Sequence, residues 1–211
     1  MSNLISPTIP QQFTPTEIEI LAMLLEEAGN EFAEHSANDF TMPATDENKA
    51  IFAAAFELCG EPQDEDDENF DEDALSIKHI MEAEDDVFIY NDWLMTYLGS
   101  RCQNLFKRPD SAPALTKAEL KIMSYLLVEA YEDRLDSAGA VCYDLTFLAT
   151  PENKTLMAAV VNFCEDEGYE EGKKEAAIDI IDTSQNEKDE IDVPDYWIMH
   201  YFAQICEKRS S

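Results

Sequence analysis

One segment of this chain occurs twice, and that duplication limits the fold more than any other feature. Residues 14–28 begin with threonine, carry glutamate three positions later and run through a Leu-Leu pair to alanine; residues 116–130 repeat that order. Similarity of this kind within one chain indicates a repeated structural unit. We therefore expect two copies of one unit.

Both copies begin with the signals of a helix N-terminus. A threonine followed three residues later by glutamate, as Thr14 is by Glu17 and Thr116 by Glu119, forms a capping box in which each residue satisfies a backbone N–H of the other. Pro15 occupies the first helical position, where the missing N–H of proline has no cost. Apolar residues then recur at helical spacing, which predicts an amphipathic helix with an acidic outer face at the start of each copy.

Each copy continues with two further matched stretches. Thr45 and Thr150 are expected to cap helices, and the apolar segments after them predict a packed central helix in each copy. The last stretch is aromatic, and its Trp, Met, Tyr and Cys residues coincide in the two copies. It predicts a closing helix with N-caps at Asn91 and Asp195.

Two shorter helices are expected at residues 74–81 and 176–181, and residues 87–90 fit either a short strand or the lead-in of the closing helix. We predict an all-α fold of two tandem helical repeats, each of about four helices, related by a pseudo-twofold axis. The expected boundaries are an N-terminal arm at 1–12, a strongly acidic first repeat at 13–106, a linker at 107–114 and a second repeat at 115–208.

The net charge of the chain is extreme and unevenly distributed. A formal charge of −32 far exceeds the magnitude of roughly 2 to 8 suggested for a small soluble domain, and its self-repulsion lowers the stability of the compact state. Before Arg101 the only basic residues are Lys49 and Lys78. Nucleic acid and anionic membranes are therefore poor direct partners, whereas a basic protein is a good one. Solubility or adaptation to salt is the alternative explanation.

The sequence offers little for catalysis or for binding a metal or cofactor. The histidines His35, His79 and His200 belong to no HExxH or similar motif, and no glycine-rich phosphate loop is present. The acidic run from Asp64 follows the pattern of a calcium loop only at its first positions, because Asn69 stands where glycine is required. We predict a protein that is not an enzyme and has no catalytic, cofactor or metal site.

The cysteines and the N-terminus bear on the cellular compartment. The five cysteines form no CxxC pair and are odd in number, so reduced and buried thiols are expected. Disulfides between Cys59 and Cys102 and between Cys164 and Cys206 remain an open alternative. The first residues lack the features of a signal peptide, and no apolar stretch approaches the roughly 18 residues of a spanning helix, so a cytoplasmic protein is expected.

Carboxylates held on rigid helices can imitate an array of phosphates, and they define the candidate site. The residues that specify the fold match between the repeats, whereas the acidity is concentrated in the first, so we expect partner binding there. The candidate partner-binding residues are Asp64, Glu65, Asp66, Asp67, Glu68, Asp71, Glu72, Asp73, Glu82, Glu84, Asp85 and Asp86.

These observations predict an acidic, non-enzymatic binding protein that blocks the basic surface of a nucleic-acid-binding or nuclease-type protein, as a DNA-mimic-like inhibitor or an immunity protein. A charge of −32 corresponds to about 16 base pairs of duplex DNA, which carries one charge per roughly 1.7 Å of axis. The alternative is a helical adaptor or scaffold that binds a protein or peptide through an aromatic or apolar groove. The matched aromatics Trp93, Tyr97, Trp197 and Tyr201 are expected in the core, and a dimer fits either function.

Overall fold

The computed structural model describes residues 13–35, 39–59, 86–137, 144–166 and 190–211, and in these the chain is mostly helical. The first half contains α1 (Pro15–His35), β1 (Asp39–Pro43), α2 (Asp46–Cys59), β2 (Asp86–Tyr90) and α4 (Asn91–Lys107). The second half contains α5 (Lys117–Ser137), β3 (Asp144–Leu148), α6 (Pro151–Asp166), β4 (Glu190–Pro194) and α8 (Asp195–Ser210). The described elements therefore follow the same order in both halves.

The strands are the main departure from the all-α prediction. β1 pairs with β2 and β3 pairs with β4, each as a small antiparallel sheet. Phe40 and Met42 of β1 are buried together with Val87 and Ile89 of β2, so one face of the first sheet joins the core. This alternation of buried and exposed positions is what a half-buried strand requires. Residues 87–90, for which the sequence left two alternatives open, form part of a strand.

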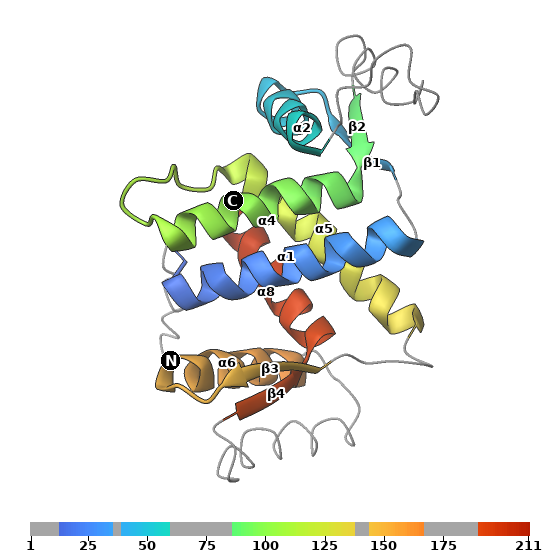
Figure 1. The fold of residues 1–211 in the computed structure, drawn as a ribbon. Helices are drawn as coiled ribbons and strands as arrows, with labels where there is room; N and C mark the ends of the chain where they lie inside the picture. Colours follow the sequence, from blue (N-terminus) through green and yellow to red (C-terminus); the bar gives the residue numbers. More distant parts are fainter. Residues whose placement is uncertain (1–12, 36–38, 60–85, 138–143, 167–189) are drawn as a thin grey trace, which may run out of the picture.

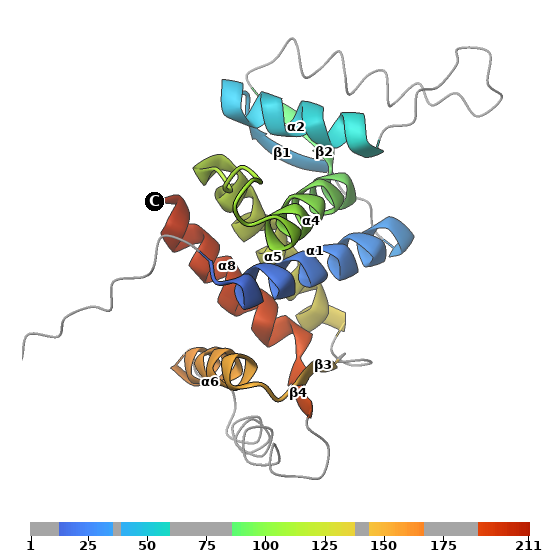
Figure 2. The ribbon, with the colours of Figure 1, turned by 60° about the vertical axis from the view of Figure 1, so that its left-hand side comes forward.

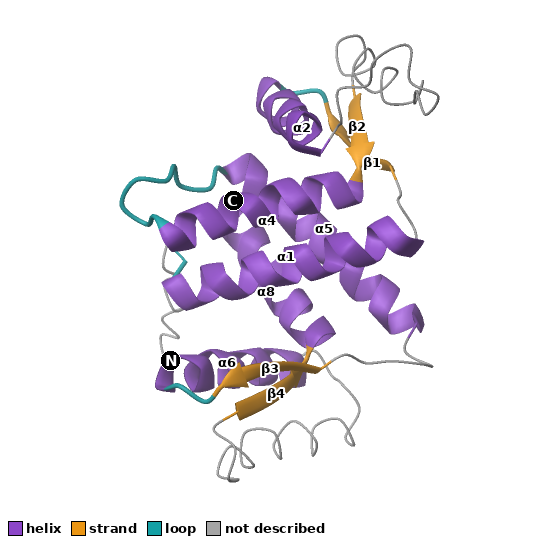
Figure 3. Ribbon diagram, viewed as in Figure 1, coloured by secondary structure: helices purple, strands orange, loops and turns teal. Residues whose placement is uncertain are grey.

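The helices α1, α4, α5 and α8 form the centre of the molecule (Figure 1). α1 packs along α4, and α5 packs along α8. α2 and the first sheet lie at one end of this central group, while α6 and the second sheet lie at the other, as the turned view also shows (Figure 2). All the described strands belong to these two outer units (Figure 3).

The core runs along the central helices. Leu21 and Leu25 of α1 and Phe202 of α8 are fully buried, and each such side chain contributes about 1.5–3 kcal/mol relative to an exposed one. α1 and α4 approach each other closely at Gly29, where an added Cβ would lie only 3.2 Å from the Cβ of Met95. A small residue at that point allows the two helices to pack this tightly.

The capping boxes predicted for both copies are confirmed. The backbone N–H of Thr14 donates to Glu17 Oε2 at 2.6 Å, and the N–H of Glu17 donates to Thr14 Oγ1 at 3.2 Å. The same exchange joins Thr116 and Glu119, with distances of 2.7 and 3.1 Å. The helices α1 and α5 therefore start where the sequence places them.

The caps of the later helices divide into two groups. Thr45 Oγ1 accepts the N–H of Asn48 at 3.1 Å, and Thr150 Oγ1 accepts the N–H of Asn153 at 3.2 Å, so these N-caps are confirmed. The N-caps predicted at Asn91 and Asp195 are wrong, because both residues are the first residue of their helix. The N-cap positions are Tyr90 and Pro194, the last residues of β2 and β4, and neither makes a side-chain capping hydrogen bond.

The short helices predicted at residues 74–81 and 176–181 lie outside the described residues. Residues 108–116 form a loop between α4 and α5. Among the described helices, none combines the length and the apolar character needed to cross a membrane.

Candidate partner-binding surface

The acidic site predicted from the sequence falls mostly outside the described residues. Asp86 is the one member of the set that the structure describes, and it is exposed at the start of β2, opposite Pro43 in the sheet. The members that lie outside are Asp64, Glu65, Asp66, Asp67, Glu68, Asp71, Glu72, Asp73, Glu82, Glu84 and Asp85.

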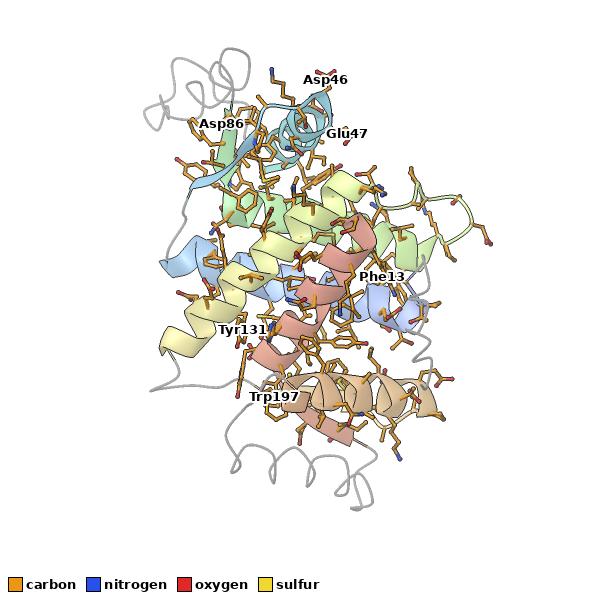
Figure 4. All side chains as sticks on the ribbon, turned by 180° about the vertical axis from the view of Figure 1, so that it is seen from behind. Phe13, Asp46, Glu47, Asp86, Tyr131 and Trp197 are labelled. Atoms are coloured by element: carbon orange, nitrogen blue, oxygen red, sulfur yellow. The ribbon has the colours of Figure 1, made fainter. Side chains whose placement is uncertain are left out.

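The described part of the first half presents further carboxylates on fixed elements. Asp46 and Glu47 are exposed in the first turn of α2, and with Asp86 they lie in the outer unit away from the central helices (Figure 4). Glu57 is exposed near the end of the same helix. Glu19 and Glu26 are exposed on α1. The predicted site includes no residue of α1 or α2, although their acidic residues can be read from the sequence.

No exposed lysine or arginine balances these carboxylates among the described residues that precede Lys107. Lys49 and Arg101 are the basic residues described there, and both are partly buried. The fully exposed charged side chains described in that part of the chain are therefore all acidic. Exposed charges of one sign raise the local potential and attract a basic partner at long range.

The matched positions of the second half differ in charge. Glu19 of α1 corresponds to Lys121 of α5, and Glu57 of α2 corresponds to Asn162 of α6. The exposed cations Lys107, Arg108, Lys117, Lys121, Lys154 and Lys208 all belong to the linker region or the second half. The excess of acid predicted for the first repeat is thus also present on its described surface.

A buried ion pair joins the two halves. Arg101 of α4 donates through Nε to Glu119 Oε1 of α5 at 2.7 Å and through Nη2 to Oε2 at 3.3 Å. The same Nη2 reaches the carbonyl oxygens of Pro113 and Ala114 at 3.3 and 3.2 Å. The hydrogen bond to Glu119 is the main cause that raises the pKa of Arg101. Arg101 therefore connects α4 of the first half both to the loop and to α5 of the second half.

A second, weaker ion pair joins an arginine of the second half to a glutamate of the first half. Arg209 of α8 lies 3.5 Å from Glu17 Oε1 of α1, and its guanidinium carbon lies 3.8 Å from the ring centroid of Phe13. Its Nε and Nη1 atoms are buried and find no hydrogen-bond partner in the structure. Glu17 and Glu119 are the matched glutamates of the capping boxes, so each contacts an arginine of the other half.

The matched aromatic residues belong largely to the core. Trp197 is only 2% exposed. Trp93 is partly buried and packs edge-on against Phe56 and Tyr90, with ring centroids 5.8 and 5.4 Å away. The indole of Trp197 is therefore closed to a partner, whereas that of Trp93 is partly covered by its aromatic neighbours. His200 is likewise packed, because Tyr131 stacks on it at 4.5 Å.

The four described cysteines are free thiols, so the disulfides that the sequence left open are not formed. The thiol of Cys59 lies 3.7 Å from the carbonyl oxygen of Trp93, and the thiol of Cys164 lies 3.9 Å from that of Trp197. Burial, reinforced by the charge of Asp92, raises the pKa of Cys59 to about 11. Thiols with so high a pKa are poor nucleophiles near neutral pH.

Two further features of the described residues bear on ligand binding. No group of three or more His, Cys, Asp or Glu side chains there is arranged to hold a metal ion. An apolar pocket of about 250 Å³ lies where the ends of the two halves meet, and Phe13, Ile18, Phe106, Pro109 and Leu115 are among its lining residues. Phe106 is 40% exposed at this pocket.

Comparisons of the chain with models of protein families, with curated proteins and with solved structures found no match.

Proposed function

We propose that this protein is an acidic, non-enzymatic binding protein that covers the basic surface of a nucleic-acid-binding or nuclease-type protein, as a DNA-mimic-like inhibitor or an immunity protein. The observation that carries the proposal is the set of exposed carboxylates on α1, α2 and β2, with no exposed cation among the described residues before Lys107. Because these elements pack on a common core, their charges keep fixed spacings, as the phosphates of a duplex do.

Carboxylates in this arrangement would replace phosphates on the arginines and lysines of the partner. Association should then be fast and sensitive to salt, since opposite net charges steer the encounter. The carboxylates from Asp64 to Asp73 and from Glu82 to Asp86 are proposed to contact the partner as well. A compartment without disulfide formation, such as the cytoplasm, agrees with the free thiols.

The first test is capture of partners from native lysate at low salt, followed by competition. We expect the captured protein to bind DNA, and we expect a duplex of about 16 base pairs to displace it from this chain. Roughly molar salt should abolish the complex, because the Debye length is then about 3 Å. Retention through molar salt, or no displacement by excess duplex, would show that charge imitation is not the basis of binding.

The second test compares two triple variants with the same change of charge. Glu19→Lys, Glu57→Lys and Asp86→Lys alter exposed positions of the first half, and one of them has lysine at its matched position in the second half. The control set is Glu132→Lys, Asp133→Lys and Glu190→Lys, which are exposed positions of the second half. The first set should weaken binding at least tenfold more than the control. Equal losses would mean that only net charge matters.

A helical adaptor is the second candidate function. The apolar pocket at the meeting point of the halves, with Phe106 exposed on it, favours this candidate because an apolar side chain of a partner could enter there. Binding that survives molar salt but is lost on Phe106→Asp would favour the adaptor over the acidic binding protein.

We also infer that the two halves are tandem repeats related by a pseudo-twofold axis. The support is the common order of elements, the matched capping boxes and the equivalent strand registers, in which Phe40 faces Ile89 and Leu145 faces Val193. Such duplication explains why residues that specify the fold recur while surface charges differ.

A further inference from the structure

The principal contacts between the two halves occur in reciprocal pairs. α1 of the first half contacts α6 and α8 of the second, and α5 of the second half contacts α2 and α4 of the first. In each case the first long helix of one half meets the central and closing helices of the other. Reciprocity of this kind is the signature of an interface in which both partners use the same surface.

The ion pairs of this interface follow the same rule. Arg101 and Arg209 both come from the closing helices, and each contacts the capping-box glutamate of the opposite half. The Arg101 pair is the stronger of the two, because it is bidentate and Glu119 is 3% exposed. The capping-box glutamate of each half is thus also a recognition residue for the other.

Between the two halves the chain continues only through the loop at 108–116. Its turn is closed by the N–H groups of Ser111 and Ala112, which donate to the carbonyl oxygen of Arg108. The helix contacts and ion pairs above come from α1, α2, α4, α5, α6 and α8, all outside this loop. They therefore do not require both halves to belong to one molecule.

We propose that this interface also joins two copies of the chain, with the first half of each copy packed against the second half of the other. The partner is thus a second copy of this protein, and the product is an exchanged dimer. The proposal rests on the duplication inferred above and is independent of the basic partner. The loop gives the intrachain arrangement an effective concentration in the millimolar range, so the monomer dominates in dilute solution. Two chains of charge −32 repel each other, so added salt favours the dimer.

A charge-swap experiment on the full chain tests the exchange directly. Arg101→Glu alone places two carboxylates at the buried pair, and Glu119→Arg alone places two guanidinium groups there. A dimer that exchanges halves between these two variants contains one original pair and one swapped pair, whereas neither variant can form either pair by itself. After co-expression in about 0.5 M salt, we expect a one-to-one dimer at twice 23.9 kDa by light scattering.

Two controls show whether the swapped ion pair is the cause of dimer formation. The single chain with both Arg101→Glu and Glu119→Arg should remain a monomer, because its pair is restored within the molecule. Co-expression of Lys121→Glu with Glu132→Lys, two exposed residues of α5, should give monomers only. A dimer from this second mixture would overturn the proposal, because general charge attraction would then account for association. Recovery of separate monomers or only aggregated chains from the Arg101 and Glu119 mixture would also overturn it.

A second variant removes the dependence on the swapped pair. Deletion of residues 109–112 shortens the loop while leaving the helices and both ion pairs unchanged in sequence. The shortened loop should hinder pairing within one chain and give a folded dimer. A folded monomer or an unfolded chain would contradict the proposal, because exchange would have preserved the helix contacts and both ion pairs.

Discussion

Removal of Arg101 gives the sharpest test of how the two halves are held together. Arg101→Met removes the bidentate contact to Glu119, with distances of 2.7 and 3.3 Å, and the donor to the Pro113 and Ala114 carbonyls. Glu119 then keeps its charge at 3% exposure without a cation beside it. Breaking a buried pair in this way typically costs 3–5 kcal/mol. Because Arg101 is itself 17% exposed, water can reach the site, and a loss of about 3 kcal/mol is expected.

The assay is urea unfolding at pH 7, followed by circular dichroism. At a denaturant dependence of about 3 kcal/mol per molar, the midpoint should fall by about 1 M. Arg209→Met is the matched control on the opposite half. It loses one contact of 3.5 Å and the stacking on Phe13, but it also removes two buried N–H donors that find no hydrogen-bond partner in the structure. The free energy of unfolding of the Arg209→Met variant should therefore stay within about 1 kcal/mol of that of the original protein.

The relative cost of the two arginine substitutions tests whether the geometry of an ion pair determines its strength. If Arg209→Met costs as much as Arg101→Met, then the geometry of the pairs does not determine their strength. The double variant Arg101→Met with Glu119→Leu provides a further check, because it removes the uncompensated charge. It should recover most of the loss, since replacement of a buried pair by apolar residues is often neutral.

Three further predictions concern stability and thiol chemistry. Gly99→Ala should raise the free energy of unfolding by about 0.5–1 kcal/mol, because alanine has the higher helix propensity and the added Cβ meets Ala22 and Leu25 at an ordinary 3.5 Å. Gly29→Ala should show no such gain, because its added Cβ would lie 3.2 Å from that of Met95. Equal gains for the two variants would contradict this explanation. The melting temperature should rise as sodium chloride increases to about 0.5 M, because self-repulsion of the −32 charge is screened; a flat response would mean that the charges are already compensated. Burial raises the pKa of Cys102 to about 12 and that of Cys59 to about 11. The contribution of these neutral thiols to the free energy of unfolding is therefore fully present below about pH 9 and is lost as the pH rises toward 11 and 12. Cys102 should react with a disulfide reagent at pH 8 only on unfolding, as a native-state labelling time course followed by mass spectrometry would show.

Local signals in the sequence accounted for the helix starts but not for the contacts between halves. The boxes of Thr14 with Glu17 and of Thr116 with Glu119 involve residues three apart, so periodicity and capping rules suffice to find them. The contact of Arg101 with Glu119 spans 18 positions and depends on how α4 and α5 meet, which no local pattern encodes. The available signal was that Arg101 is the first arginine of a chain so poor in bases.

The strands were harder to predict because they are short and lie beside strong helix signals. In β1 only Phe40 and Met42 alternate inward before Pro43 ends the strand, and that is too brief a period to separate from a loop. The caps assigned to Asn91 and Asp195 failed for the same reason, since a strand ends immediately before each helix. The sign of the charge and its excess in the first half could be read from the sequence, whereas the placement of exposed carboxylates on α1, α2 and β2 depends on the fold.

The double role of Glu119 has a consequence for how the protein opens. This carboxylate accepts the N–H of Thr116, the residue directly before its own helix, and also binds the guanidinium of the opposite half. The first turn of α5 therefore cannot unwind by ordinary end fraying while the halves remain together. The amide hydrogens of Glu119 and Leu120, which donate to Thr116, should exchange with solvent only in the same cooperative opening that separates α4 from α5. Those of Glu17 and Ile18 in the first turn of α1, where the Arg209 contact is long, should exchange earlier.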